Sequence, residues 1–180
     1  MKKILAISGS TRKASTNEAI LRKIKERYAK SIDVVLYDGI DTLSHFNPDF
    51  DRETVPESVS TFRNLINEAD GVLICTPEYV FSLPGSLKNA LEWTVSTVVF
   101  SYKPVGLIVA SANGTKALES LDIIMSTLIQ YPVPDKAKLL IGGGRSKISA
   151  TGDIEKEVMS EIEGLVDFLI EEIARKEEVN

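Results

Sequence analysis

A run of small polar residues near the start of the chain has the composition of a phosphate-binding loop. Residues 9–17 read GSTRKASTN and follow a short apolar run. A helix that begins in this segment offers unpaired N–H groups and a partial positive charge, and both attract phosphate. A helix cap accounts for one hydroxyl, because Ser and Thr are favoured caps. The remaining donors therefore predict a phosphate site, and they are Ser10, Arg12, Ser15, Thr16 and Asn17.

The loop also indicates which kind of phosphate it binds. It carries neither the GxGxxG pattern of dinucleotide-binding loops nor the GxxxxGK[ST] pattern of P-loops. A terminal monophosphate surrounded by hydroxyls fits this composition best. FMN is a common ligand with such a group.

Two further segments have an unusual composition. Residues 76–86 read TPEYVFSLPGS, and residues 111–115 read SANGT. Tyr79 and Phe81 place aromatic rings beside prolines that stiffen the turn. These rings either line a binding crevice or cover the edge of a sheet, and composition alone leaves both readings open.

Short apolar runs alternate with helical patterns along the whole chain, and together they predict where these three segments lie. The runs lack polar alternation, as strands buried on both faces do, and they cover Lys3–Ile7, Asp33–Leu36, Gly71–Cys75, Val105–Ala110 and Lys138–Ile141. Apolar residues at helical spacing predict helices over Thr16–Lys30, Glu57–Ala69, Pro84–Thr94, Lys116–Ile129 and Asp153–Lys176. The long stretch Asp38–Pro56 is expected to be a loop.

This alternation predicts an α/β fold with helices on both faces of a parallel sheet. Five strands match a flavodoxin-like three-layer sandwich with strand order 2-1-3-4-5, and residues 1–180 are expected to form a single domain. Ligands of such sheets bind beyond the carboxyl ends of the strands, where the strand order reverses. The three unusual segments follow the first, third and fourth strands, so we expect them to face one crevice.

Composition excludes several other classes of protein. The chain has a net charge of −5, which argues against a nucleic-acid partner. No apolar run approaches the length of a membrane span. The only cysteine, Cys75, rules out an internal disulfide and favours a cytoplasmic location.

Residues 77–93, PEYVFSLPGSLKNALEW, resemble the PEYN-x-S-x-PG-x-LKNA-[IL]-[DE]-W signature of NAD(P)H-dependent FMN reductases in the flavodoxin-like superfamily. This family includes azo, quinone and chromate reductases. The first loop resembles the family's GS-x-R-x-x-S-x-N phosphate motif. The resemblance implies that Ser10, Arg12, Ser15 and Asn17 hold the FMN phosphate. It also implies that the flavin ring lies along Pro77, Glu78, Tyr79, Val80, Phe81, Ser111, Ala112, Asn113 and Gly114.

The resemblance also implies an activity. NAD(P)H, either NADPH or NADH, would reduce the bound FMN, which then passes electrons to a flavin, quinone, azo compound or metal oxyanion. No catalytic side chain is expected. Family members are commonly homodimers or homotetramers, and the candidate contact is the helix ending at Trp93 together with Thr97–Tyr102, where Val98, Val99 and Phe100 look exposed.

Two departures from the family keep two alternatives open. Val80 stands where the family usually has asparagine, and SANGT carries Gly114 alone where the family's loop is often glycine-rich. One alternative is a flavodoxin-type electron carrier, although its phosphate loop normally lacks an arginine. The other is a flavin-free binding protein with the same fold.

Other reactive side chains have simpler interpretations. Cys75 is expected to be a buried, inert thiol, and His45 has no second ligand nearby for a metal. Asp49, Asp51 and Glu53 are expected to form a solvated loop face, and Trp93 to be a packing residue. The sequence GGGR at 142–145 is read as a turn, with a cofactor contact from Arg145 as the lesser option.

Overall fold

The computed structural model describes residues 1–51, 54–143, 147–149 and 152–179. Its strands are β1 (Lys2–Ser8), β2 (Ile32–Tyr37), β3 (Gly71–Thr76), β4 (Val105–Ser111) and β5 (Lys138–Gly142). Its α-helices are α1 (Thr16–Tyr28), α2 (Glu57–Glu68), α3 (Gly85–Glu92), α4 (Thr115–Ile129) and α6 (Lys156–Val179). Two short 3₁₀ helices complete the described elements, η1 (Pro48–Phe50) and η2 (Asp135–Ala137).

The strands form one parallel five-stranded sheet in the order β2-β1-β3-β4-β5, which confirms the predicted flavodoxin-like topology. β1 and β3 are neighbours, with Ser8 opposite Cys75, and Thr76 of β3 lies opposite Val109 of β4. Strands β1, β3 and β4 therefore end at the same edge of the sheet. Their following loops start side by side, as the sequence predicted.

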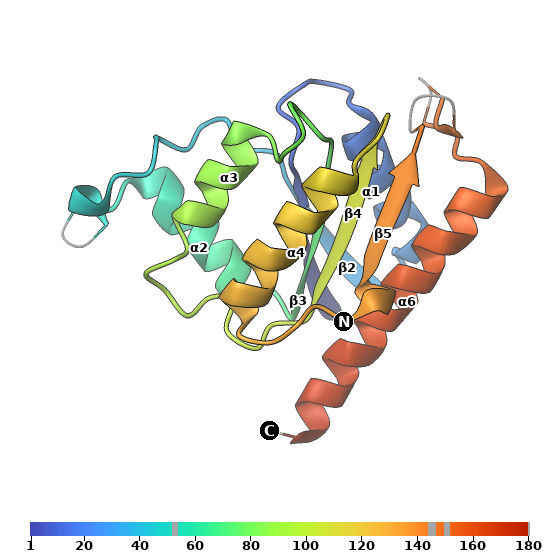
Figure 1. Cartoon of the computed structure of the whole chain (residues 1–180). Helices are drawn as coiled ribbons and strands as arrows, with labels where there is room; N and C mark the ends of the chain where they lie inside the picture. The colour runs from blue at the N-terminus through green and yellow to red at the C-terminus, as the bar shows by residue number, and fades with distance from the viewer. Residues whose placement is uncertain (52–53, 144–146, 150–151, 180) are drawn as a thin grey trace.

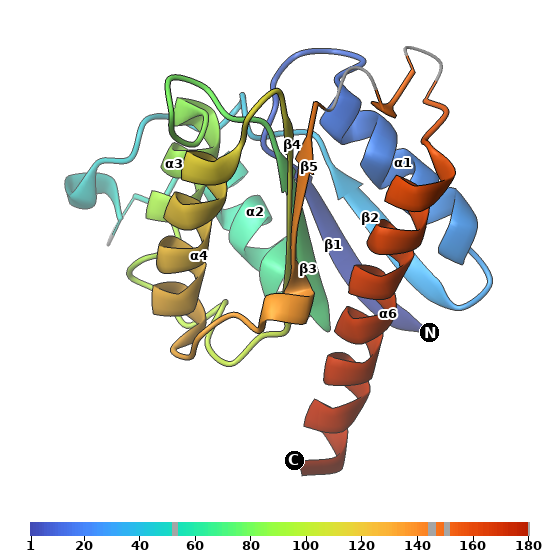
Figure 2. The ribbon, with the colours of Figure 1, turned by 45° about the vertical axis from the view of Figure 1, so that its right-hand side comes forward.

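The helices form a layer on each face of the sheet. Figures 1 and 2 show α1 and α6 on one face and α2, α3 and α4 on the other. Successive residues of β1 point to opposite faces, since Leu5 and Ile7 pack in the core beneath α2 to α4, while Ile4 and Ala6 pack beneath α1 and α6. Every residue of β3 is buried, which explains its uninterrupted apolar sequence.

Helix ends differ from the predicted ones by a few residues. Pro84 lies just before α3 in an extended conformation, and the helix ends at Glu92, so α3 is shorter than predicted. Helix α6 continues to Val179 beyond the last buried stripe residue, Ile173. Figure 2 shows this end of α6 extending past the sheet.

Within the described part of the chain, no helix is both long and apolar enough to cross a membrane. Over the same residues, no three acidic, histidine or cysteine side chains gather in a group that could hold a metal ion.

Candidate functional site

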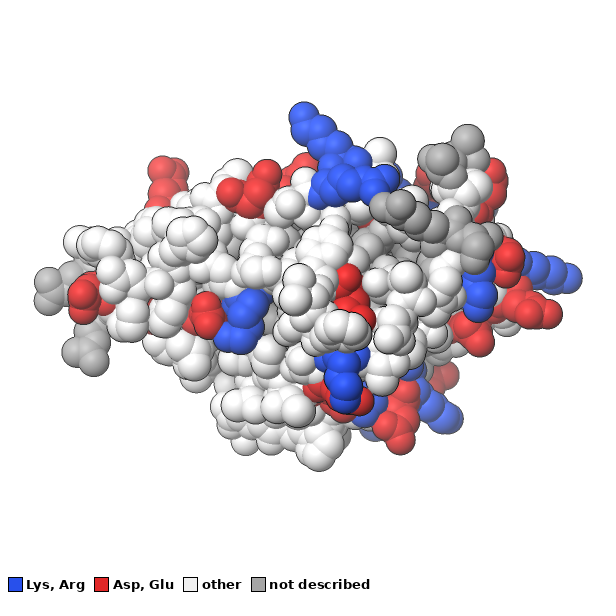
Figure 3. Space-filling view, turned by 45° about the horizontal axis from the view of Figure 1, so that its top comes forward, with Lys and Arg blue, Asp and Glu red and all other residues white. Residues whose placement is uncertain are grey.

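A cavity of about 470 Å³ lies among the loops that follow β1, β3 and β4. This volume is in the range of small-molecule sites. Most of the predicted site residues line it, namely Ser10, Arg12, Ser15, Thr16, Asn17, Pro77, Tyr79, Ser111 and Ala112. Figure 3 tilts this end of the molecule toward the reader and shows a group of positive side chains at the top of the view, with acidic and uncharged side chains around it.

The start of helix α1 supplies the donors on one side of the cavity. Ser15 is the N-cap, and its Oγ accepts a hydrogen bond of 3.1 Å from the N–H of Glu18. The N–H groups of Thr16 and Asn17 have no acceptor among the described residues. Both residues line the cavity. The first turn of α1 can therefore donate hydrogen bonds to an anion placed there.

Hydrogen bonds within the first loop fix its shape. The N–H of Ser10 donates to Ser8 Oγ at 3.3 Å, and Ser10 Oγ accepts from the N–H of Arg12 at 3.3 Å. The Arg12 side chain is exposed and forms no ion pair with any residue that the structure describes. Its guanidinium is therefore available to an anionic ligand.

Gly9 joins the first loop to β3. Its N–H donates to the Cys75 carbonyl at 2.8 Å. A Cβ at this position would lie 2.2 Å from Thr76 Oγ1, closer than side chains allow. Only glycine permits this approach, so the base of the first loop is held against the end of β3.

A second hollow of about 400 Å³ lies on the other side of the first loop. Ser10 and Arg12 line it as well, together with Lys13, Tyr37 and Asp41. Lys13 lines this second hollow but not the first cavity. A Lys13 variant is therefore a matched control for an Arg12 variant.

The loop after β3 contains a tight turn that the sequence did not predict. Tyr79 and Ser82 exchange backbone hydrogen bonds of 3.0 and 3.1 Å, and the two residues between them have φ values of 51° and 55°. Positive φ at both central positions is the pattern of a type I′ turn, which favours asparagine and glycine. The central residues here are Val80 and Phe81, 95% and 71% exposed. Neither lines the cavity, so the structure places them beyond it, at the tip of the turn.

Glu78 links the loop after β3 to helix α4. Its carboxylate accepts hydrogen bonds from the N–H groups of Lys116 at 2.9 Å and Ala117 at 3.0 Å. The helix has no cap from its own N-terminal residue, Gly114, whose φ is 97°. The Glu78 side chain therefore caps α4 from a neighbouring loop. The sequence predicted a ring-lining position for Glu78 and gave no signal for this contact.

The loop after β4 contributes only in part. Ser111 and Ala112 line the cavity, whereas Asn113 and Gly114 do not. Gly143, which sequence reasoning treated as part of a turn, lines the cavity and donates its N–H to the Ala112 carbonyl at 3.3 Å. Its φ of 68° is a conformation that glycine adopts readily, and the run of glycines was the available signal for it. Gly144 and Arg145 lie outside the described residues, so the lesser option, a cofactor contact from Arg145, stays a prediction.

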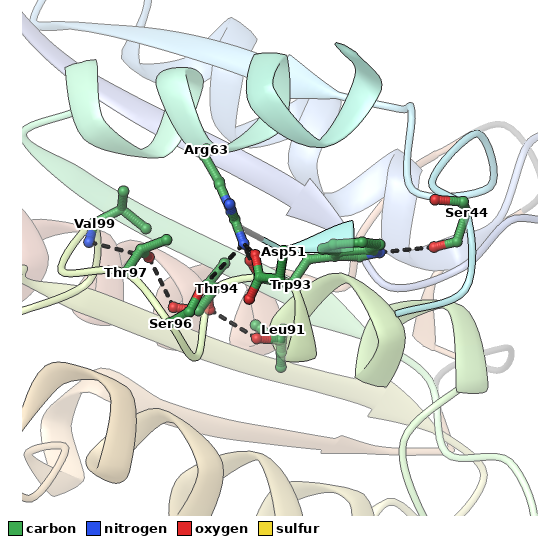
Figure 4. Close-up of polar contacts among 9 residues, drawn as sticks. All are labelled: Ser44, Asp51, Arg63, Leu91, Trp93, Thr94, Ser96, Thr97 and Val99. Atoms are coloured by element: carbon green, nitrogen blue, oxygen red, sulfur yellow. Dashed lines mark hydrogen bonds and ion pairs between the residues drawn. The ribbon is translucent and has the colours of Figure 1, made fainter. Parts of the chain in front are cut away.

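A largely buried polar cluster joins α2, the end of α3 and the long loop between β2 and α2 (Figure 4). Arg63 of α2 donates to the carbonyl of Trp93 and pairs with Asp51. The Asp51 side chain is only 6% exposed. The prediction that Asp51 lies on a solvated loop face is therefore wrong, because Arg63 draws its carboxylate inward. Glu53 lies outside the described residues.

Residues 87–93, LKNALEW, contribute to this cluster and not to the cavity. The indole of Trp93 is fully buried and donates to the Ser44 carbonyl at 2.7 Å, which confirms its packing role. Asn89 donates to the same carbonyl at 3.0 Å and accepts from the N–H of Phe46 at 2.7 Å. Both side chains fasten the long loop between β2 and α2.

The remaining predictions have mixed outcomes. Phe100 is 2% exposed, so its predicted exposure is wrong: the ring packs in the core beneath α2 to α4. Val99 is half-buried and Val98 is exposed. Cys75 is fully buried as predicted, and burial raises the pKa of its thiol, which keeps the thiol protonated.

Comparisons with known proteins agree with this architecture. Residues 2–145 match the family model for NADPH-dependent FMN reductase. An NAD(P)H-dependent FMN reductase of Pseudomonas aeruginosa is 32% identical over 154 residues, covering 83% of each chain. A quinone reductase of Pseudomonas putida is 27% identical over 169 residues, covering 91% of this chain and 90% of that one.

Among solved structures, the flavoenzyme NAD(P)H:acceptor oxidoreductase of Paracoccus denitrificans has the same fold. It superposes with a TM-score of 0.76 at 24% identity, over 97% of this chain and 98% of the other. The family match covers β1 to β5 and every loop that borders the cavity. The chain therefore belongs to the NADPH-dependent FMN reductase family.

Proposed function

We propose that the cavity binds FMN and that the chain uses it to pass electrons from NAD(P)H to a small-molecule acceptor. One observation carries the proposal. The free N–H groups at the start of α1, with the polar side chains of the first loop, open into the same cavity as Pro77 and Tyr79. A phosphate needs such donors, and a flat ring suits an uncharged wall. The donors at the start of α1 therefore fit the phosphate of FMN, and the wall that contains Pro77 and Tyr79 fits its flavin ring.

The two ends of FMN would contact different groups of residues. The phosphate would be held by Ser10, Arg12, Ser15, Thr16 and Asn17. The ring would lie along Pro77, Tyr79, Ser111 and Ala112, with Glu78, Val80, Phe81, Asn113 and Gly114 in the adjoining segments. We assign the whole of residues 1–180 to one FMN-binding domain.

Bound FMN supplies the redox chemistry, namely hydride uptake from NAD(P)H and electron delivery to an acceptor. The residues of the chain bind and orient the cofactor. Backbone N–H groups near the ring would stabilise negative charge on it, an electrostatic role that needs no general acid, base or nucleophile. We therefore assign no catalytic side chain.

We propose a flavin, quinone, azo compound or metal oxyanion as the acceptor. NAD(P)H and the acceptor would occupy the same exposed face of the flavin in turn. Steady-state kinetics should then be ping-pong, with parallel double-reciprocal lines. Intersecting lines would show that both substrates bind together and would contradict this sequence of events.

The absorbance spectrum of the purified protein, with and without added FMN, tests the proposal directly. A two-banded yellow spectrum that bleaches within seconds of anaerobic NADPH or NADH addition would support a flavin reductase. A bound flavin that stays oxidised would instead favour an electron carrier fed by another protein. Absence of flavin uptake would favour a flavin-free binding protein and would overturn the proposal.

We also propose that the chain assembles as a homodimer or homotetramer in the cytoplasm. Exposed apolar side chains support the assembly, since Val95, Val98 and Tyr102 between α3 and β4 are 64%, 78% and 59% exposed. Ile123 on α4 is 71% exposed. Sedimentation at micromolar concentration should show a dimer or larger species, and a monomer alone would contradict the assembly.

A further inference from the structure

The amide of Asn17 is held in one orientation by a buried thiol. Asn17 lies in the first turn of α1, is 3% exposed and lines the cavity. Its Oδ1 accepts a hydrogen bond of 3.3 Å from the thiol of Cys75, at the carboxyl end of β3. Because a primary amide has its oxygen on one side and its N–H groups on the other, this contact directs Nδ2 away from Cys75.

The Asn17 Nδ2 group is open to the cavity. No hydrogen bond from Nδ2 to a described residue is found. Every fully buried side-chain nitrogen or oxygen among the described residues has a hydrogen-bond partner. Nδ2 therefore keeps some accessible surface, and the cavity is what Asn17 borders. Its two N–H bonds are placed to donate to a ligand at the start of α1.

The thiol is suited to act as a permanent donor. Cys75 is fully buried among apolar side chains that include Ala6, Ile108 and Ala110, and burial raises the pKa of its S–H group. A thiolate at this position would accept a hydrogen bond and turn the amide over. The protonated thiol instead donates to the amide oxygen at 3.3 Å, which keeps Nδ2 on the cavity side.

We propose that Cys75 is a positioning residue for the FMN phosphate: its thiol holds the Asn17 amide with both N–H bonds toward the cavity. The inference rests on the proposed function, because it assumes that the ligand at the start of α1 is the FMN phosphate. Cys75 itself touches no ligand. The selectivity of the site for FMN over riboflavin, which lacks the phosphate, thus depends in part on a side chain buried behind the loop.

The test compares FMN and riboflavin affinities by fluorescence titration in the wild type, Cys75→Ala and Cys75→Ser. A neutral hydrogen bond is worth about 2- to 10-fold in affinity. Cys75→Ala should weaken FMN binding by about this factor and leave riboflavin binding unchanged. Cys75→Ser keeps a donor and should restore most of the FMN affinity. Riboflavin binding also shows that each variant is folded.

Ile108→Val provides the matched packing control. Ile108 lies opposite Cys75 on β4 and packs in the same core, but its side chain has no group that could form a hydrogen bond with the Asn17 amide. This variant should lower the melting temperature while keeping the ratio of FMN to riboflavin affinity. A change of that ratio equal to the one in Cys75→Ala would assign the effect to packing and overturn the inference.

Two further outcomes would also overturn it. Cys75→Ala could bind FMN as tightly as the wild type, or it could lose FMN and riboflavin affinity to the same extent. In both cases the wild type still binds FMN, so the proposed function stands. A wild-type protein that binds no FMN would instead remove the proposed function, and this inference with it.

Discussion

At the scale of single residues, the polar side chains of the first loop divide into two groups. Ser15, together with Ser8 at the end of β1, uses its oxygen to hold the backbone of the loop and the start of α1. Arg12 and Asn17 keep donor groups that the described part of the chain does not satisfy. The first loop thus contains residues that build the site and residues that are free to contact its ligand.

Arg12 should be the strongest single contributor among the side chains that reach the phosphate. Arg12→Ala should weaken FMN binding by roughly 1.5–3 kcal/mol, the range for a hydrogen bond to a charged group. Riboflavin affinity should stay unchanged, because riboflavin carries no phosphate. Lys13→Ala removes the same charge from the neighbouring residue outside the cavity and serves as the control. Equal losses in both variants would show a general effect of net charge instead.

The sequence allowed residue roles to be predicted where they depend on local chemistry. The hydroxyl-rich loop and a hydroxyl cap at the start of its helix follow from residue type and order, and the structure identifies that cap as Ser15. The partner of the Glu78 side chain could not be predicted, because Lys116 lies 38 residues later in the chain and only the folded sheet brings the two together. The burial of Asp51 was missed for the same reason, since Arg63 lies on another element.

At the scale of elements, the turn at residues 79–82 stores backbone strain. A β-branched residue at positive φ is a genuine outlier, and the left-handed conformation costs about 1–2 kcal/mol. Val80→Asn should therefore raise the free energy of unfolding by roughly 0.5–1 kcal/mol, because asparagine tolerates this conformation. The Val80 side chain is 95% exposed, so little packing is lost.

Urea unfolding of Val80→Asn and Val98→Asn measures this effect. Val98 is also an exposed valine, and its φ is not positive. The gain should appear at position 80 alone. A similar gain at both positions would show that asparagine stabilises through its polarity, and no gain at position 80 would show that the turn carries no strain.

The Arg63 cluster should contribute strongly to stability, because it joins α2 to the end of α3 and to the long loop. The Arg63 and Asp51 side chains are 13% and 6% exposed. Arg63→Met should lower the free energy of unfolding by about 3–5 kcal/mol, since it removes the charge that pairs with the buried Asp51 carboxylate. The exposed Arg175, which pairs with Glu172, provides the control Arg175→Met, for which a loss below about 1 kcal/mol is expected.

Chemical denaturation of both variants and of the double variant Arg63→Met, Asp51→Asn completes this test. The double variant should recover part of the loss, because the carboxylate that has lost Arg63 is replaced by a neutral amide. A double variant as unstable as the single one would assign the loss to packing around Trp93 instead.

Elements were easier to predict than the contacts between them. The strands follow from apolar runs whose burial on both faces demands an apolar sequence, and their predicted ends agree to within a residue or two. The long loop after β2 was predicted only as irregular. Its path depends on Asn89, Trp93 and Arg63, which hold it from distant positions, and no local pattern encodes such contacts.

At the scale of the whole molecule, the alternation of strands and helices sufficed to predict the sheet order and the edge that carries the cavity. The assembly state could not be predicted from this alternation. The exposed apolar side chains support the proposed assembly, yet the burial of Phe100 shows that an apolar run between elements also packs in the core.

The stability of the fold should fall in alkaline solution. Burial, followed by the charges of Asp38 and Asp41, raises the pKa of Tyr37 from 10.0 to about 12. The unfolded chain therefore loses this proton first, and the stability from Tyr37 is lost as the pH rises from 10 to 12. Burial also raises the pKa of Tyr28, which adds to this loss of stability at alkaline pH. Burial lowers the pKa of Lys103, and this shift makes stability rise with pH instead.

The variant Tyr37→Phe tests the contribution of the Tyr37 hydroxyl to this pH dependence. The variant keeps the ring that packs on Phe62, with ring centres 4.9 Å apart, and removes the ionisable hydroxyl. The urea midpoint of Tyr37→Phe should decline less steeply than that of the wild type between pH 10 and 12. Identical slopes for the two proteins would show that Tyr37 ionises alike in the folded and unfolded states.

The close approach of Gly9 to Thr76 has a consequence for how the protein recognises its ligand. The base of the first loop is joined to the end of β3 by a backbone hydrogen bond, and the sheet fixes the spacing between them. The two walls of the cavity are thus held at a fixed separation, and only a ligand of matching length from phosphate to ring can contact both. Flavin analogues with a shorter or longer sugar-alcohol chain should be rejected even when both of their ends are chemically correct.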